Sequence, residues 1–242
     1  MKLALISDIH GNLEALVSVL SHIEEQKADK IHCLGDVIGY GSDPVSCLEL
    51  VAKNCDIKLL GNHEHAAMGI DDTSDYNPAA QKSTEWTKHQ LSDREKSMLA
   101  EFEMSRVLDN TLLVHASPCD PEQWPYILTP EAALDAFVEL KQTICFFGHS
   151  HVPQIYCERD EDLPRMQVGH DFAPDPENRY LVNVGSVGQP RDNDPRACYV
   201  TFDTEEFEIF FHRVDYDIET AQDKMAQANL PQMLIARLSL GR

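Results

Sequence analysis

The sequence predicts an α/β protein with a parallel sheet near its amino terminus and antiparallel strands in its second half. The first sixty residues repeat the order strand, loop, helix, which is typical of a parallel sheet with right-handed crossovers. From about residue 153 onward the candidate strands look antiparallel, so the fold as a whole has α+β character. The chain has 242 residues, of which 43% are hydrophobic, enough for a sizeable core. We expect a single domain over residues 1–242.

The first half is organised by short apolar runs that end in turn residues. Apolar residues at helical spacing follow the first run, and Asn12 is placed to cap that helix. A loop with two glycines, residues 39–44, leads into the second helix. The strands expected here cover residues 2–6, 31–34 and 57–60, and the helices cover residues 13–27 and 45–53.

Residues 65–105 look helical, and the segment Ser92-Asp93-Arg94-Glu95 has the form of a capping box. Asp109-Asn110 is a plausible hairpin turn, and Thr129-Pro130 is a strong helix start. The acidic stretch 160–178 reads as a poorly ordered excursion or a loop over the site. The remaining expected strands are 107–108, 111–114, 144–147, 154–157, 180–184, 197–202 and 207–214, and the remaining helices are 130–140, 217–228 and 231–240.

Composition excludes some classes of function. The formal charge of −21 weighs against binding of long nucleic acid, which requires a basic surface. It does not weigh against a small phosphorylated substrate, because bound cations can invert the local field. The seven cysteines form no C-x-x-C pair, which favours a reducing cytoplasmic location without disulfides. No apolar run approaches the ~20 residues that a membrane span needs.

Metal-ligating residue types stand at the ends of several predicted strands. Asp8-x-His10 offers one oxygen and one nitrogen to a single ion, and Asp36 is placed to bridge two ions. Asn62 offers a neutral carbonyl oxygen. Three further histidines offer nitrogens: His115, His149 and His151. Two adjacent divalent cations can clamp the attacking and leaving oxygens of a phosphoryl displacement, and they make a water acidic enough to act as nucleophile near neutral pH. The sequence therefore predicts a two-metal hydrolytic site.

Taken in order, these motifs resemble the calcineurin-like metallophosphoesterases. The resemblance rests on five motifs: Asp8-Ile9-His10, Gly35-Asp36, Gly61-Asn62-His63-Glu64, His115 and Gly148-His149-Ser150-His151. It implies a four-layer αββα sandwich of two mixed β-sheets flanked by helices. It also implies a first metal held by Asp8, His10, Asp36 and His151, and a second held by Asp36, Asn62, His115 and His149.

The resemblance further implies that His63 protonates the leaving oxygen or steadies the transition state. It is weaker for the Ser/Thr protein phosphatase branch, because that branch's arginines are missing here after Asp36 and after Glu64. Residues 183–191 resemble bacterial members grouped with dinucleoside tetraphosphate hydrolases and small phosphatases. Arg191 is our candidate for holding a substrate phosphate, since a guanidinium fork fits phosphate oxygens. Asn12 is a second candidate substrate contact, although a helix cap explains it equally well.

We therefore expect a metal-dependent hydrolase acting on a phosphomonoester or a dinucleoside polyphosphate. The alternatives are a phosphodiesterase acting on cyclic nucleotides or nucleic acid ends, and a non-catalytic interaction module with the same fold. The mixed ligands suit manganese, iron, zinc, cobalt or nickel. The other six histidines, including His65, are interpreted as structural. Tyr40 either lines the pocket or packs its own loop, and Arg191 could instead pair with Asp192 or Asp194.

Overall fold

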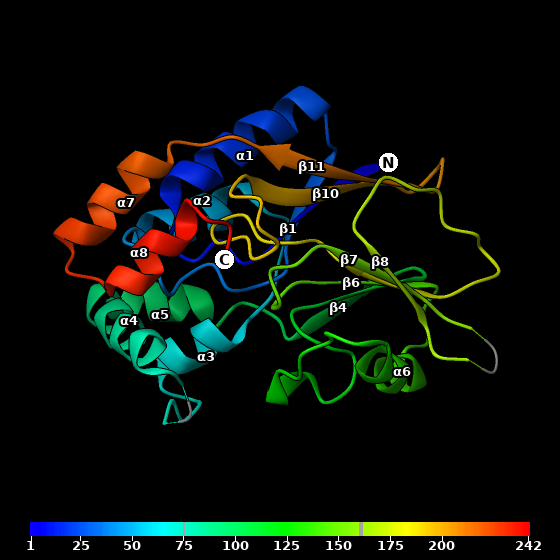
Figure 1. Ribbon diagram of the computed structural model, residues 1–242, viewed down its shortest axis with the longest axis horizontal. Helices are drawn as coiled ribbons and strands as arrows, with labels where there is room; N and C mark the ends of the chain where they lie inside the picture. The colour runs from blue at the N-terminus through cyan, green and yellow to red at the C-terminus, as the bar shows by residue number, and fades with distance from the viewer. Residues whose placement is uncertain (75, 160–161) are drawn as a thin grey trace.

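The structure is a computed structural model that describes residues 1–74, 76–159 and 162–242 (Figure 1). Its strands form two sheets. The first sheet has the order β11-β10-β1-β2-β3, and the second has the order β4-β5-β6-β9-β7-β8. The strand bounds are β1 Lys2–Ile6, β2 Lys30–Cys33, β3 Ile57–Lys58, β4 Ser105–Leu108, β5 Thr111–Val114, β6 Ile144–Phe147, β7 Gln154–Cys157, β8 Arg165–Val168, β9 Tyr180–Asn183, β10 Ala197–Asp203 and β11 Glu208–Val214.

Helices cover the outer faces of both sheets and one end of the molecule. Their bounds are α1 Leu13–Gln26, α2 Pro44–Asn54, α3 Asn62–Met68, α4 Pro78–Gln90, α5 Asp93–Leu99, α6 Pro130–Glu139, α7 Ile218–Gln227 and α8 Gln232–Leu238. Figure 1 shows the two sheets face to face, with α1 outside the first sheet and α6 outside the second. This arrangement confirms the predicted four-layer sandwich of two mixed sheets.

Both sheets contain a parallel core with antiparallel strands at the sides. In the first sheet β1, β2 and β3 are parallel, and β10 pairs antiparallel with β1. In the second sheet β5, β6 and β9 are parallel, and β4 and β7 are antiparallel to their neighbours. The parallel strands β6 and β9 are fully buried, as strands covered on two faces are expected to be, whereas β2 starts at the exposed Lys30.

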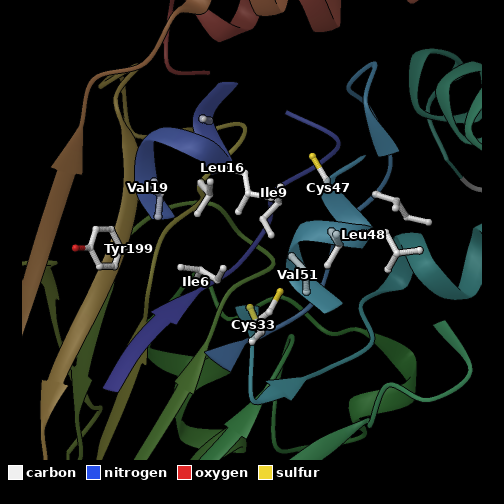
Figure 2. Close-up of a cluster of buried hydrophobic side chains, with 14 of the residues drawn as sticks. Ile6, Ile9, Leu16, Val19, Cys33, Cys47, Leu48, Val51 and Tyr199 are labelled. Atoms are coloured by element: carbon white, nitrogen blue, oxygen red, sulfur yellow. The ribbon is translucent and has the colours of Figure 1, made fainter. Parts of the chain in front are cut away.

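The residues of β1 show how the layers are held together. Leu3 and Leu5 belong to the core between the two sheets, whereas Ala4 and Ile6 belong to the core under the helices. This division follows from the alternation of side chains along a strand. Figure 2 shows the core under the helices, where Ile6 and Tyr199 of the first sheet meet side chains of α1 and α2.

Two expectations about the second half were wrong. The segment 160–178 contains strand β8, which pairs antiparallel with β7 at the edge of the second sheet. Arg165, Met166 and Val168 are exposed, so the segment carries no buried pattern from which a strand could be predicted. Strand β9 was expected among antiparallel strands, but it also pairs parallel with β6, as Cys145 opposite Leu181 shows. Residues 160 and 161 lie outside the described residues.

Several local predictions are confirmed. Asn12 caps α1 by accepting a hydrogen bond from the backbone of Ala15, and Ser92 and Glu95 form the capping box of α5. All seven cysteines are free thiols. Within the described part of the chain, no helix has the length and apolar character needed to cross a membrane.

Candidate metal centre and active site

The predicted ligands follow the carboxyl ends of parallel strands from both sheets. Asp8 and His10 follow β1, and Asp36 follows β2. His115 follows β5, and His149 follows β6. Carboxyl ends of parallel strands meet at one edge of a sheet. The two sheets are joined at this edge, because the backbone amide of Gly188 donates to the carbonyl of Asp8 at 2.9 Å. Residues distant in sequence are thereby brought together.

The first group of ligands consists of Asp8, His10, Asp36 and His151. All four are buried, and each offers one ligand atom, with these atoms within 4.8 Å of one another. His151 Nε2 lies 3.3 Å from Asp8 Oδ1, and His10 Nε2 lies 3.7 Å from Asp36 Oδ2. The predicted first-metal residues are therefore all in one place.

Hydrogen bonds fix the orientation of the two imidazoles in this group. His10 Nδ1 lies 3.2 Å from the carbonyl of Ile38, and His151 Nδ1 lies 2.6 Å from the carbonyl of Gln189. A carbonyl only accepts, so each Nδ1 carries a proton, and each neutral ring presents an unprotonated Nε2. These two Nε2 atoms face one another at 3.0 Å. Two converging lone pairs fit a shared cation, so the residues present suit a metal ion.

The second group consists of Asp36, His115 and His149, which also lie within 4.8 Å of one another. His115 Nε2 is 3.3 Å from Asp36 Oδ2. His115 Nδ1 faces the carbonyl of Leu34 at 2.8 Å, which directs Nε2 toward the cluster. Asp36 belongs to both groups, which is the arrangement expected of a carboxylate that bridges two ions.

Asn62 is the remaining predicted ligand of the second metal, and it lines the same cavity as His149. Its Nδ2 donates to the hydroxyl of Tyr76 at 2.8 Å, which fixes the amide. Three buried ligand atoms have no hydrogen-bond partner among the described residues: Asn62 Oδ1, His115 Nε2 and His149 Nε2. An unsatisfied buried polar atom costs about 1–3 kcal/mol. A metal ion at this position would satisfy all three, so the second group also fits a cation.

Five of the candidate ligands have strained backbone conformations. Asp8, His10, Asp36, His149 and His151 have φ angles of 53°, 50°, 51°, 64° and 62°, all in the left-handed region. Such conformations cost of order 1–3 kcal/mol each and persist where the surroundings enforce them, often at functional sites.

Glycines allow these loops to pack closely. A Cβ atom at Gly61 would lie 2.1 Å from Asp36 Oδ1, and one at Gly148 would lie 2.3 Å from Asp8 Oδ2. Both distances are far below van der Waals contact. Glycine is therefore required beside both carboxylates, as its position in the motifs suggested.

Glu64 positions the loop that carries Asp36. Its buried carboxylate accepts the backbone amides of Asp36 and Gly61 at 2.8 Å each, and that of Ile38 at 3.1 Å. Burial and the charge of Asp36 raise the pKa of Glu64 to about 7. The sequence motif contains Glu64, but sequence reasoning assigned it no role.

The charges of the cluster favour ionised carboxylates. Burial alone would raise the pKa values of Asp8 and Asp36. The charge of His151 nevertheless holds the pKa of Asp8 below its usual range, and the charge of His115 does the same for Asp36. Burial alone would lower the pKa of His115, yet the charge of Asp36 raises it to about 9. For His149 burial dominates and lowers the pKa to about 3. Ionised carboxylates and neutral imidazoles are the forms that bind metals, so His115 would have to lose its proton to bind one, whereas His149 is already neutral.

His63 lies beside the cluster and faces a cavity. Its backbone amide donates to Asp36 Oδ1 at 3.0 Å, and its ring packs against Tyr40 and His10 at 4.4 and 4.8 Å between centroids. The cavity has a volume of about 380 Å³, and His63, Asn62 and His149 are among its lining residues. Burial lowers the pKa of His63 to about 4. The neutral ring is therefore the prevailing form near pH 7.

The two candidate substrate contacts differ in their surroundings. Asn12 uses both ends of its amide within the protein, because Nδ2 also donates to the carbonyl of Gly188 at 2.9 Å. Arg191 makes no ion pair within the described part of the chain, since Asp192 pairs with Arg213 and Asp194 with Arg196. The interpretation of Asn12 as a helix cap thus agrees with the structure. The alternative in which Arg191 pairs with Asp192 or Asp194 was wrong. The substrate contacts of both residues stay predictions.

Sequence reasoning missed an aromatic wall of the cavity. Tyr76, Trp124 and Tyr126 line it together with Tyr40. Tyr126 stacks on His149 with centroids 4.0 Å apart. These three residues lie in loops without periodicity, so only the composition of the loops could have indicated them. The six histidines interpreted as structural are absent from both groups of ligands.

Comparisons with known proteins agree with this geometry. Residues 1–206 match the model of the calcineurin-like phosphoesterase superfamily domain. An uncharacterized protein of Methanocaldococcus jannaschii is 37% identical over 246 residues, covering 99% of this chain and 98% of that protein. The crystal structure of a metallophosphoesterase from Sphaerobacter thermophilus has a TM-score of 0.87 at 36% identity, covering 100% of this chain and 99% of that one.

A hypothetical protein from Pyrococcus horikoshii shares the fold, with a TM-score of 0.80 at 18% identity and coverage of 100% of this chain and 98% of that one. The family model spans most of the chain, and the first two relatives are well above 30% identical over nearly its full length. The chain belongs to the calcineurin-like phosphoesterase superfamily.

Proposed function

We propose that this protein hydrolyses a phosphomonoester or a dinucleoside polyphosphate with the help of two divalent metal ions. The observation that carries the proposal is the pair of buried ligand groups that share Asp36. One group contains Asp8, His10 and His151, and the other contains His115 and His149, with Asn62 Oδ1 unpaired beside them. Metal ions held there would supply Lewis-acid chemistry and make a water nucleophilic near neutral pH.

The residues around the cluster have separate tasks. Asp36 is the shared carboxylate, and Glu64 holds its loop in place through three backbone amides. His63 faces the cavity and stabilises the leaving oxygen. Because its pKa is about 4, its ring is neutral near pH 7 before substrate binds and can donate a hydrogen bond. The arrival of an anionic substrate would raise that pKa, which brings proton transfer to the leaving oxygen within reach.

The cavity supports a substrate with a planar group next to the scissile phosphate. Tyr76, Trp124 and Tyr126 offer ring faces within a space of about 380 Å³. Stacking of a base on an aromatic side chain contributes about 1–3 kcal/mol. A nucleoside leaving group or an aryl ester would fit this wall. The formal charge of −21 disfavours long nucleic acid as a substrate, because its phosphate backbone requires a basic surface.

A substrate panel tests the proposal. Protein loaded in turn with manganese, iron, zinc, cobalt or nickel is assayed on p-nitrophenyl phosphate, bis-p-nitrophenyl phosphate and diadenosine tetraphosphate. We expect metal-dependent hydrolysis of the first or third compound. Faster cleavage of the diester would favour the phosphodiesterase alternative. No cleavage of any compound with any metal would contradict an enzymatic function and favour an interaction module.

A further inference from the structure

Two arginines converge on one neutral acceptor beside the metal cluster. Gln189 Oε1 accepts hydrogen bonds from Arg191 Nη2 at 2.9 Å and from Arg237 Nη1 at 3.2 Å. Arg191 lies in the loop after β9, whereas Arg237 lies in α8 near the carboxyl terminus. Two segments 46 residues apart in sequence therefore bring two positive charges to the same oxygen.

Five arginines of the described residues pair with a carboxylate, namely Arg94, Arg106, Arg179, Arg196 and Arg213, but Arg191 and Arg237 do not. Within residues 1–74, 76–159 and 162–242, no carboxylate oxygen lies within 4.0 Å of either guanidinium. The nearest acids along the chain are already engaged, Asp192 by Arg213 and Asp194 by Arg196. In addition, Arg191 Nε is buried and donates to no atom of the described residues. In a chain with a charge of −21, such a pair points to an external anion.

The pair is attached directly to the candidate metal ligands. The backbone amide of Arg191 donates to the carbonyl of His151 at 3.2 Å, and the carbonyl of Gln189 faces His151 Nδ1 at 2.6 Å. The Arg191 guanidinium lies 5.8 Å from the centre of the Tyr40 ring. Tyr40 in turn packs against His10 at 4.5 Å between centroids. The arginines thus lie next to the cluster without belonging to it.

We propose that Arg191, Gln189 and Arg237 form a second anion subsite, which binds a phosphate of the substrate other than the one being hydrolysed. Two guanidinium forks match the oxygens of a phosphate group, and Gln189 Oε1 holds the two forks side by side. The inference rests on the proposed function and narrows its substrate class to compounds that carry at least two phosphates. A simple monoester would leave this subsite unfilled.

Kinetics on two substrates that differ by one phosphate test the subsite. The manganese-loaded protein is assayed on adenosine diphosphate and adenosine monophosphate, as wild type and as Arg237→Gln. Loss of a charged hydrogen bond is expected to lower the ratio of the two kcat/KM values by about tenfold or more. Arg237→Lys keeps the charge, so its ratio should lie between those of the wild type and Arg237→Gln. Arg242→Gln is the control, because the Arg242 side chain is exposed and, among the described residues, donates to Asn193 rather than to Gln189. An unchanged ratio in Arg237→Gln would overturn the proposal.

Binding provides a readout that does not depend on hydrolysis. Inorganic pyrophosphate is titrated calorimetrically into protein stripped of metal with a chelator. We expect the wild type and Arg242→Gln to bind it about tenfold or more tightly than Arg237→Gln does. Equal binding by all three proteins would overturn the subsite. Binding that depends on Arg237 in a protein that hydrolyses no phosphate compound would instead support the subsite and contradict the proposed function.

Discussion

Replacement of Glu64 by glutamine tests how the shared carboxylate is positioned. Oε2 of Glu64 accepts the amides of Asp36 and Gly61, and Oε1 accepts the amide of Ile38. In Glu64→Gln, the amide oxygen can replace only one of the two oxygens. If it takes the place of Oε2, the new NH2 group faces the Ile38 amide, and two donors meet in a buried place. The opposite orientation loses two hydrogen bonds.

The free energy of unfolding that Glu64→Gln loses follows from the cost of one unsatisfied buried donor, which is about 1–3 kcal/mol. Relief from burying a charge offsets part of this cost, because burial already raises the pKa of Glu64 to about 7. For a chain of this length, each kcal/mol corresponds to about 2–4 °C in Tm. The loosened Asp36 loop should also weaken manganese binding by about 10- to 100-fold, as loss of a group that orients metal ligands usually does.

Calorimetric titration with manganese and thermal unfolding measure both effects. Glu95→Gln is a matched control, because Glu95 is also a buried glutamate in a capping interaction but lies in α5, away from the cluster. We expect both variants to lose stability and only Glu64→Gln to lose metal affinity. Wild-type manganese affinity in Glu64→Gln would refute the view that Glu64 positions Asp36.

Three further outcomes follow from the structure. His63→Ala should keep its metal and lose hydrolysis by ~10²-fold or more; unchanged turnover would mean that another group serves the leaving oxygen. Gly61→Ala should weaken metal binding, because its Cβ would lie 2.1 Å from Asp36 Oδ1, whereas Gly69→Ala, with open space around its Cβ, should not; calorimetry that finds equal losses would contradict the steric argument. Burial and then His22 lower the pKa of His212 to about 4, so its contribution to stability is complete above pH ~6.5 and is lost as the pH falls toward 4. His212→Gln should therefore lose free energy of unfolding less steeply than the wild type over that range, with slopes that differ by at most about 1 kcal/mol per pH unit given its partial exposure; parallel curves of unfolding free energy against pH would contradict this.

Local signals predicted the buried parallel strands and the candidate ligands at their ends, whereas the sandwich was implied by the family resemblance and is confirmed. Buried parallel strands such as β1 are continuous apolar runs, and Asp8 or His149 stands directly where such a run ends. The positive φ angles of these residues could not be predicted, because tertiary contacts enforce them. Strand β8 was not predicted, because this exposed edge strand has no alternation of buried and exposed residues in its sequence.

The parts of the site that come from loops and from the carboxyl terminus were also beyond sequence reasoning. Trp124 and Tyr126 enter the cavity from an irregular segment, and nothing in their spacing indicates which way they face. Arg237 sits in an ordinary amphipathic helix. Only the packing of α8 beside the loop after β9 brings it to Gln189.

Anomalous diffraction from crystals grown with manganese would show whether two divalent ions share Asp36. We expect two peaks about 3.5–4 Å apart on either side of the Asp36 carboxylate. One should lie against Asp8, His10 and His151, and the other against Asn62, His115 and His149. No peak in this pocket, or a single peak that leaves Asn62 and His149 without a metal, would contradict the account.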